Sequence, residues 1–204
     1  DFLILPFFLG PSLGVTDWLP KRIAEFREEF PDLRIKLASC LARDREGEEI
    51  LSGVVRDRVH EVSCREMLKR PFVAFVDHGT PVSGVNQVRE RVGERVRKLL
   101  GEEVARLWTC SMERRPEPDY AFNEPLLETL LRDETAVPSG DVVVAQFSLS
   151  PGRHAGAGGD VDEICREAER VRPGLRVHLT EPLGEHPLVL DLLEQRFRQA
   201  IDAG

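Results

Sequence analysis

Short apolar runs alternate with charged, helix-like segments along the chain, and this alternation limits the possible fold more than any other feature. The apolar runs predict six strands, at residues 2–9, 33–39, 72–77, 104–111, 142–149 and 175–181. The segments between them have apolar residues at helical spacing and predict helices at residues 17–30, 48–62, 82–100, 124–131, 161–171 and 188–201. Continuous apolar strands joined by helices form parallel sheets covered on both faces, so we expect an α/β fold of this type.

The sequence also repeats itself. Residues 1–14 align with residues 141–154, and residues 30–42 align with residues 172–184, whereas the segment 72–140 has no counterpart in the first copy. We therefore predict an incomplete first repeat at residues 1–68 and a complete second repeat at residues 69–204. We expect that an amino-terminal segment is missing, with a partial duplication as the alternative. An incomplete repeat is also compatible with a homodimer.

Composition excludes several classes of protein. The chain has 204 residues and a formal net charge of −8, which argues against a general nucleic-acid binder because such proteins usually carry a basic face. No continuous apolar run reaches the length of a membrane span, so we expect no membrane association. The four cysteines form no C-x-x-C pair and predict reduced, mostly buried thiols in a cytoplasmic protein.

Polar residues stand where three strands of the second repeat end. His78-Gly79-Thr80 follows the first strand, Glu113 follows the second, and His154 lies beyond the third. Because the carboxyl ends of parallel strands share one edge of a sheet, the two histidines and the glutamate are expected to converge. Two imidazoles and a carboxylate suit a divalent cation such as cobalt, iron, nickel or zinc, and they also suit proton removal near neutral pH.

Glycines near these residues point to a bulky, flat ligand. Gly79 would allow a tight turn after His78, and Gly152 with the glycine-rich run 155–159 would let a planar molecule approach the main chain. Arg153 offers a fork for a carboxylate, and Asp160 is predicted to cap the following helix. The residues expected to contact the substrate are therefore Gly79, Thr80, Gly152 and Arg153.

Each of these features has a structural alternative. A single histidine at a strand end is more often a hydrogen-bonded structural residue than a ligand, and the glycine-rich run could be a plain loop. The arginines within residues 82–100 predict a solvated helix face. In the aligned first repeat, however, Gly14 replaces His154 and Leu13 replaces Arg153. Loss of both polar residues together favours a site that is kept in one half only.

Four segments in order resemble the CbiX-type sirohydrochlorin chelatases, which belong to the class II tetrapyrrole chelatases. They are VDHGTP at 76–81, SMERRPEPDYAFNEPLLETLL at 111–131, FSLSPGRHAG at 147–156 and LGEHPLVLDLL at 183–193. The family pattern has strands that end in H-G-S/T, in a glutamate and in L-x-x-G-x-H, and then L-G-x-H-P before the last helix. The resemblance covers about residues 70–204 and implies ferrochelatase-like repeats.

The resemblance also implies an activity. Such enzymes insert Co²⁺ or Fe²⁺ into sirohydrochlorin, a polycarboxylated macrocycle of cobalamin or siroheme biosynthesis, without ATP. The expected partner is thus a tetrapyrrole, the divalent metal is a substrate, and no organic cofactor is expected. By position, His78 and His154 match the histidines that bind metal and accept pyrrole protons, and Glu113 matches their acidic partner.

Three hypotheses follow from the sequence. The leading one is a metal chelatase acting on sirohydrochlorin or a close tetrapyrrole. The second is a non-catalytic protein of the same family that binds metal or tetrapyrrole. The third is an α/β scaffold in which His78 and His154 are only structural.

Overall fold

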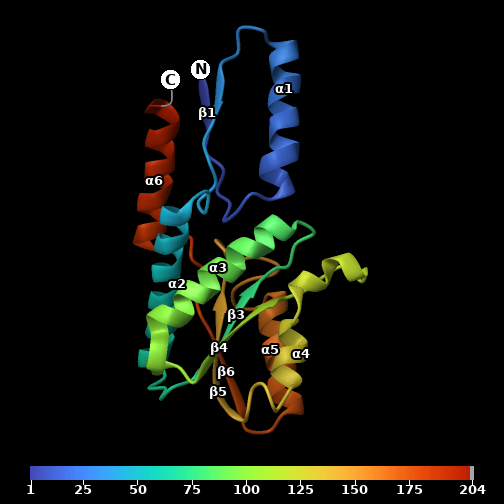
Figure 1. The fold of residues 1–204 in the computed structure, drawn as a ribbon, viewed down its shortest axis with the longest axis vertical. Coiled ribbons are helices and arrows are strands. Elements are labelled where there is room, and N and C mark those ends of the chain that lie inside the picture. Colours follow the sequence, from blue (N-terminus) through green and yellow to red (C-terminus); the bar gives the residue numbers. More distant parts are fainter. Residues whose placement is uncertain (203–204) are drawn as a thin grey trace.

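The computed structural model describes residues 1–202 and contains two sheets whose strands all run parallel (Figure 1). The larger sheet has four strands, in the spatial order β4 (Arg106–Ser111), β3 (Phe72–Asp77), β5 (Gly140–Gln146) and β6 (Leu175–Leu179). Their register pairs Phe72 with both Arg106 and Val142. The predicted parallel α/β fold is confirmed.

Helices cover both faces of the four-stranded sheet. On one face Val73 and Phe75 pack with α2 (Arg45–Arg65), α3 (Ser83–Leu100) and α6 (Pro187–Asp202). On the other face Ala74 and Val76 pack with α4 (Leu127–Arg132) and α5 (Asp160–Val171). Because side chains alternate between the faces of a strand, one continuous apolar run supplies both cores.

The amino-terminal part forms the smaller sheet. It consists of β1 (Phe2–Ile4) and β2 (Ile35–Leu37), with a short π-helical turn at Gly14–Trp18 and α1 (Leu19–Glu29) between them. In Figure 1 these blue elements lie beyond α3, at one end of the molecule. The predicted strands 2–9 and 33–39 shrink to three residues each, because within residues 1–202 each strand finds only the other as a partner.

The helix α2 links the two predicted repeats. It belongs by sequence to the first repeat, yet its buried side chains pack on the four-stranded sheet. The buried guanidinium of Arg196, in α6, donates to the main-chain oxygen of Leu41 at 2.8 Å and to both carboxylate oxygens of Asp44. Asp44 in turn accepts from Gly47 N–H and caps α2. The division at residue 68 stays a prediction.

A pair of backbone hydrogen bonds occurs twice in the chain. Leu41 N–H and Ala42 N–H donate to the main-chain oxygens of Phe8 and Leu9, at 3.0 and 2.8 Å. In the second half, Leu183 N–H and Gly184 N–H donate to Ser148 and Leu149, both at 2.8 Å. These residues occupy equivalent places in the aligned segments, so the bonds support the internal repeat that the sequence predicts.

Several element ends differ from the predictions by a few residues. Turns of 3₁₀ helix at Gly101–Glu103 and Pro118–Asn123 delay the start of β4 and precede α4. The last predicted residues of the strands at 142–149 and 175–181 lie beyond β5 and β6, in the loops that carry polar side chains. Boundaries of this kind depend on which strand lies alongside, which local periodicity does not encode.

Two further expectations concern membrane association and the state of the cysteines. Among residues 1–202, no helix is both long and apolar enough to cross a membrane. All four cysteines are free thiols; three are buried and Cys64 is exposed. Burial raises the pKa of Cys165 to about 12, so this thiol is inert at neutral pH.

An ion pair at the edge of the sheet gives a prediction on acid stability. Arg176 donates to both oxygens of Asp141 at 2.8 Å, and His178 lies 3.0 Å from one of them, which lowers the pKa of Asp141 to about 2. A carboxyl whose folded pKa is depressed stabilises the fold above its unfolded pKa, and this contribution disappears as the pH falls from about 4 to about 2.

We expect the wild type to lose about 1 kcal/mol more unfolding free energy than Asp141→Asn over this range, a value reduced for solvent screening. Urea unfolding at pH 5 and pH 2.5 measures the difference. The exposed Asp119→Asn variant is the control and should follow the wild type. Parallel losses in wild type and Asp141→Asn would contradict the prediction.

Candidate functional site

The three side chains predicted to converge lie together at the carboxyl end of the four-stranded sheet. The rings of His78 and His154 have centroids 4.4 Å apart and meet edge to face. Nε2 of His78 lies 3.5 Å from Oε1 of Glu113. The strands that follow β3 in the chain, β4 and β5, lie on opposite sides of it, so the strand order reverses at β3. Ligands of open α/β sheets bind in the crevice at such a point, and the two histidines and the glutamate occupy it here.

The turn after β3 places His78 against the end of β4. Pairing continues past the sheet, because Met112 N–H donates to Asp77 O at 2.8 Å and Glu113 N–H donates to His78 O at 3.1 Å. Gly79 has φ +97°, and a Cβ atom there would lie 1.9 Å from the main-chain oxygen of Glu113. Only glycine therefore allows this approach of the two strand ends.

A buried network of polar side chains stabilises the turn after β3 from the protein interior. Arg89, in α3, is 1% exposed and donates to Asp77 Oδ1 at 3.1 Å and to the hydroxyl of Ser111. Asn123 is fully buried and binds Thr80 twice, accepting from its N–H at 3.0 Å and donating to its oxygen at 2.9 Å. Thr80 is thus fixed through its main chain.

Two of these residues were missed or misassigned from the sequence. Arg89 was predicted to lie on a solvated helix face, and this was wrong because the helix turns it toward the strand ends. No local signal marks Asn123, whose partner Thr80 lies 43 residues earlier in the chain. A buried arginine needs carboxylate partners: the neighbouring Glu90 accepts from it at 2.6 Å, and the structure adds Asp77 at 3.1 Å from the end of β3.

The loop from β5 to α5 carries His154. Gly156 N–H donates to the side-chain oxygen of buried Gln146 at 2.8 Å, which ties the loop to the sheet. Nδ1 of His154 lies 2.6 Å from Oδ2 of Asp160. The prediction that Asp160 caps α5 was wrong: Gly159 occupies the N-cap, and Asp160 is the first helical residue. Its carboxylate faces the imidazole instead.

Hydrogen bonds at Nδ1 decide which nitrogen each histidine presents. Nδ1 of His78 lies 3.1 Å from the main-chain oxygen of Gly79, and Nδ1 of His154 faces the Asp160 carboxylate. Both partners only accept, so both Nδ1 atoms carry a hydrogen in the neutral rings. The Glu113 carboxylate, 3.5 Å from Nε2 of His78, is too far to accept a hydrogen bond from it. Each Nε2 therefore keeps its lone pair for a metal or a proton.

The site is open. The side chains of His78, His154 and Glu113 are 46%, 43% and 63% exposed. Within residues 1–202 no group of three or more His, Cys, Asp and Glu side chains is placed so that it could hold a metal ion, so Glu113 as a third metal ligand stays a prediction. An open pair of imidazoles suits a metal that is passed on, since a closed four-ligand cage would retain the ion.

An apolar pocket of about 260 Å³ adjoins the His78 turn. One wall comes from the segment after β1 and includes Phe7 and Phe8. The other comes from α3 and from the residues just after β5, with Val88 and Phe147. A smaller cavity of about 30 Å³ lies between His78 and His154 and is lined by Met112 and Gln146. The site thus combines two nitrogen donors with an apolar wall.

The remaining predicted substrate contacts lie on the loop rim. Gly152 and Arg153 are exposed, just before His154. A Cβ atom at Gly152 would meet nothing within 4 Å, so the main chain there is freely approachable. The structure brings Gly79 and Thr80 into the pocket wall, whereas Gly152 and Arg153 face solvent beside the histidines.

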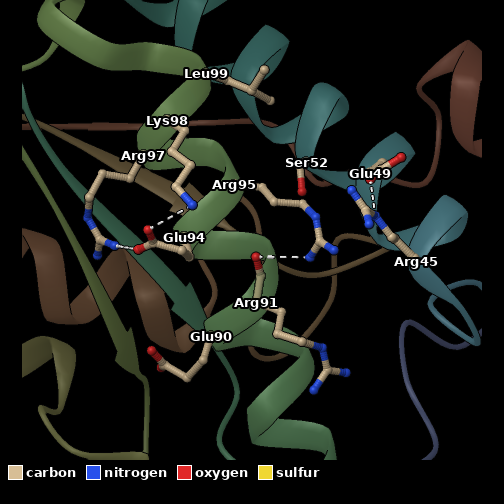
Figure 2. Close-up of a pocket in the computed structure, with 10 residues that line it drawn as sticks. All are labelled: Arg45, Glu49, Ser52, Glu90, Arg91, Glu94, Arg95, Arg97, Lys98 and Leu99. Carbon is tan, nitrogen blue, oxygen red and sulfur yellow. Dashed lines mark hydrogen bonds and ion pairs between the residues drawn. The ribbon is translucent and has the colours of Figure 1, made fainter.

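A larger hollow of about 790 Å³ lies between α2 and α3, away from the strand ends (Figure 2). Its charged side chains form ion pairs: Arg45 pairs with Glu49 at 2.7 Å, and both Arg91 and Arg95 pair with the buried carboxylate of Glu48. Among residues 1–202, its lining holds no histidine, cysteine or aromatic ring, so it lacks the imidazole donors and the aromatic wall that are found at the strand ends.

Comparison with known families agrees with the geometry. The CbiX family model matches residues 73–200, which is more than half of the chain and includes all three converging side chains. The chain belongs to the CbiX family. The search of curated proteins found no match to this chain.

Solved structures share the fold of the CbiX chain. SirB from Bacillus subtilis with Fe³⁺ matches with a TM-score of 0.69 and 16% identity, over 98% of this chain and 72% of SirB. SirB from Bacillus subtilis subspecies spizizenii in complex with cobalt gives 0.67 and 16%, over 98% and 69%. CbiX, a terminal enzyme of siroheme biosynthesis in denitrifying bacteria, gives 0.64 and 14%, over 97% and 75%.

Proposed function

We propose that this CbiX chain is an ATP-independent chelatase that inserts a divalent metal, cobalt or iron, into sirohydrochlorin or a closely related tetrapyrrole. The observation that carries the proposal is the pair of imidazoles, whose ring centroids lie 4.4 Å apart, beside an apolar pocket. The structural relatives with Fe³⁺ and with cobalt are described as SirB, and one of them as a sirohydrochlorin chelatase. That description supports the same substrate class here.

The reaction exchanges one metal dication for two pyrrole protons. In our proposal the Nε2 atoms of His78 and His154 hold the metal and accept those protons as the metal moves into the ring. Glu113, 3.5 Å from Nε2 of His78, stabilises the positive charge that His78 gains on protonation. The two protons then leave to water through the open side of the site.

The substrate is a flat ring with carboxylate arms, and the site offers a partner for each part. Phe7 and Phe8 line the pocket next to His78 and provide an apolar surface for one face of the macrocycle. The turn Gly79-Thr80 lines the pocket beside His78, and the open main chain at Gly152 lets the ring approach closely. Arg153 is exposed beside His154 and is proposed to bind a carboxylate arm.

We place the reaction in the cytoplasm, where free thiols persist, and in cobalamin or siroheme biosynthesis. The test follows the visible spectrum of sirohydrochlorin mixed with Co²⁺, with and without the purified chain. We expect the chain to accelerate insertion. Glu49→Gln, in the hollow between α2 and α3, is the matched control and should insert metal at the wild-type rate. Tight binding of sirohydrochlorin without acceleration would replace the chelatase by a tetrapyrrole carrier.

A further inference from the structure

The carboxylate of Asp160 lies behind His154 and has no role in the proposed reaction steps. Oδ2 of Asp160 lies 2.6 Å from Nδ1 of His154, a short charge-assisted hydrogen bond. The backbone around it is also fixed, because Asp160 N–H donates to Arg153 O at 2.9 Å and Val161 N–H donates to His154 O at 3.3 Å. Both ends of the contact are therefore held in place by the main chain.

We propose that Asp160 is the positioning residue of His154, an inference that rests on the proposed function. By accepting the Nδ1 hydrogen it selects the tautomer with a free Nε2 lone pair and sets the plane of the ring. A carboxylate behind a metal-binding imidazole also makes the ring a stronger donor. Asp160 thus acts on the metal through His154 and does not touch it.

The helix end by itself does not account for this arrangement. Acidic residues stabilise a helix amino terminus, and the first turn of α5 holds three of them: Asp160, Asp162 and Glu163. Asp162 is buried and binds Gly158 N–H and Arg166, and Glu163 is exposed. Of these three residues, Asp160 is the one whose carboxylate contacts His154, so its orientation is explained by that hydrogen bond.

The two histidines become unequal as a result. Nδ1 of His78 is held at 3.1 Å by a neutral main-chain oxygen, whereas Nδ1 of His154 faces a full negative charge at 2.6 Å. The second arrangement donates more electron density to the ring. His154 is then the firmer metal ligand of the pair, and His78, beside Glu113, is the more readily detached one.

The test compares Asp160→Ala, Asp160→Glu and the exposed control Glu163→Ala, which removes an equal charge from the same helix turn. Nitrogen-15 NMR of the metal-free chain reports the tautomer of His154, and titration with Co²⁺ alone reports metal affinity. We expect Asp160→Ala to shift His154 toward the Nε2–H tautomer and to weaken Co²⁺ binding about 10- to 100-fold. Asp160→Glu should recover part of the loss, and Glu163→Ala should match the wild type.

Two results would overturn the proposal. One is an unchanged His154 tautomer in Asp160→Ala, and the other is an equal loss of Co²⁺ affinity in Glu163→Ala, which would assign the effect to the helix end. A chain that fails to insert metal into sirohydrochlorin would instead remove the proposed function. The nitrogen spectra need neither metal nor macrocycle, so they decide the role of Asp160 in that case as well.

Discussion

Replacing either His78 or His154 by alanine is expected to slow metal insertion about 100- to 10,000-fold, the usual contribution of a positioned acid or base. The two rings lie side by side, with centroids 4.4 Å apart. Removing one ring takes away both a metal ligand and a proton acceptor. Initial rates of the visible spectral change at saturating Co²⁺ and sirohydrochlorin measure the effect.

The two substitutions should also be strongly non-additive. If the imidazoles act as a unit on one metal ion, the double variant will be little slower than either single variant. His60→Gln, in α2 and away from the strand ends, is the control for loss of a histidine. Since both site rings are more than 40% exposed, thermal unfolding should change little. Near wild-type rates in both single variants would leave the histidines as structural residues.

Gly79→Ala is expected to damage both stability and activity. The new Cβ would lie 1.9 Å from Glu113 O, and φ +97° is a conformation that side chains other than glycine rarely adopt. Relief requires the turn to move away from β4, which separates His78 from Glu113. We expect a loss on the order of 3 kcal/mol in unfolding free energy, measured by urea denaturation, with insertion falling at least about tenfold.

Gly152→Ala provides the matched control, since its Cβ would meet nothing within 4 Å. Its unfolding free energy should stay within about 0.5 kcal/mol of the wild type. If the macrocycle approaches the main chain there, the variant will nevertheless raise the KM for sirohydrochlorin. A Gly79→Ala protein as stable and as active as Gly152→Ala would show that the turn after β3 does not set the site.

The fold could be predicted because the information for it is local. The run Val73–Val76 is apolar at every position, which indicates a strand with both faces covered, and α3 follows with helical spacing. Once the sheet is parallel, the residues after each strand must share one edge, so His78, Glu113 and His154 were placed correctly relative to one another. The predicted lengths of β1 and β2 were wrong because the length of a strand depends on its neighbouring strands.

The parallel α/β architecture and the two histidines at one sheet edge follow from the sequence alone, because apolar periodicity and the residues after each strand are local features. What supports the two histidines is visible only in the folded chain. Segments far apart in the chain meet at three places. Asn123 binds Thr80, Arg89 is buried beneath the strand ends, and Phe7 lines the pocket beside His78. Even Asp160, six residues from His154, required the loop conformation to show which way its carboxylate turns. Such contacts depend on which distant segments and loops meet in the folded chain, and local periodicity does not encode that.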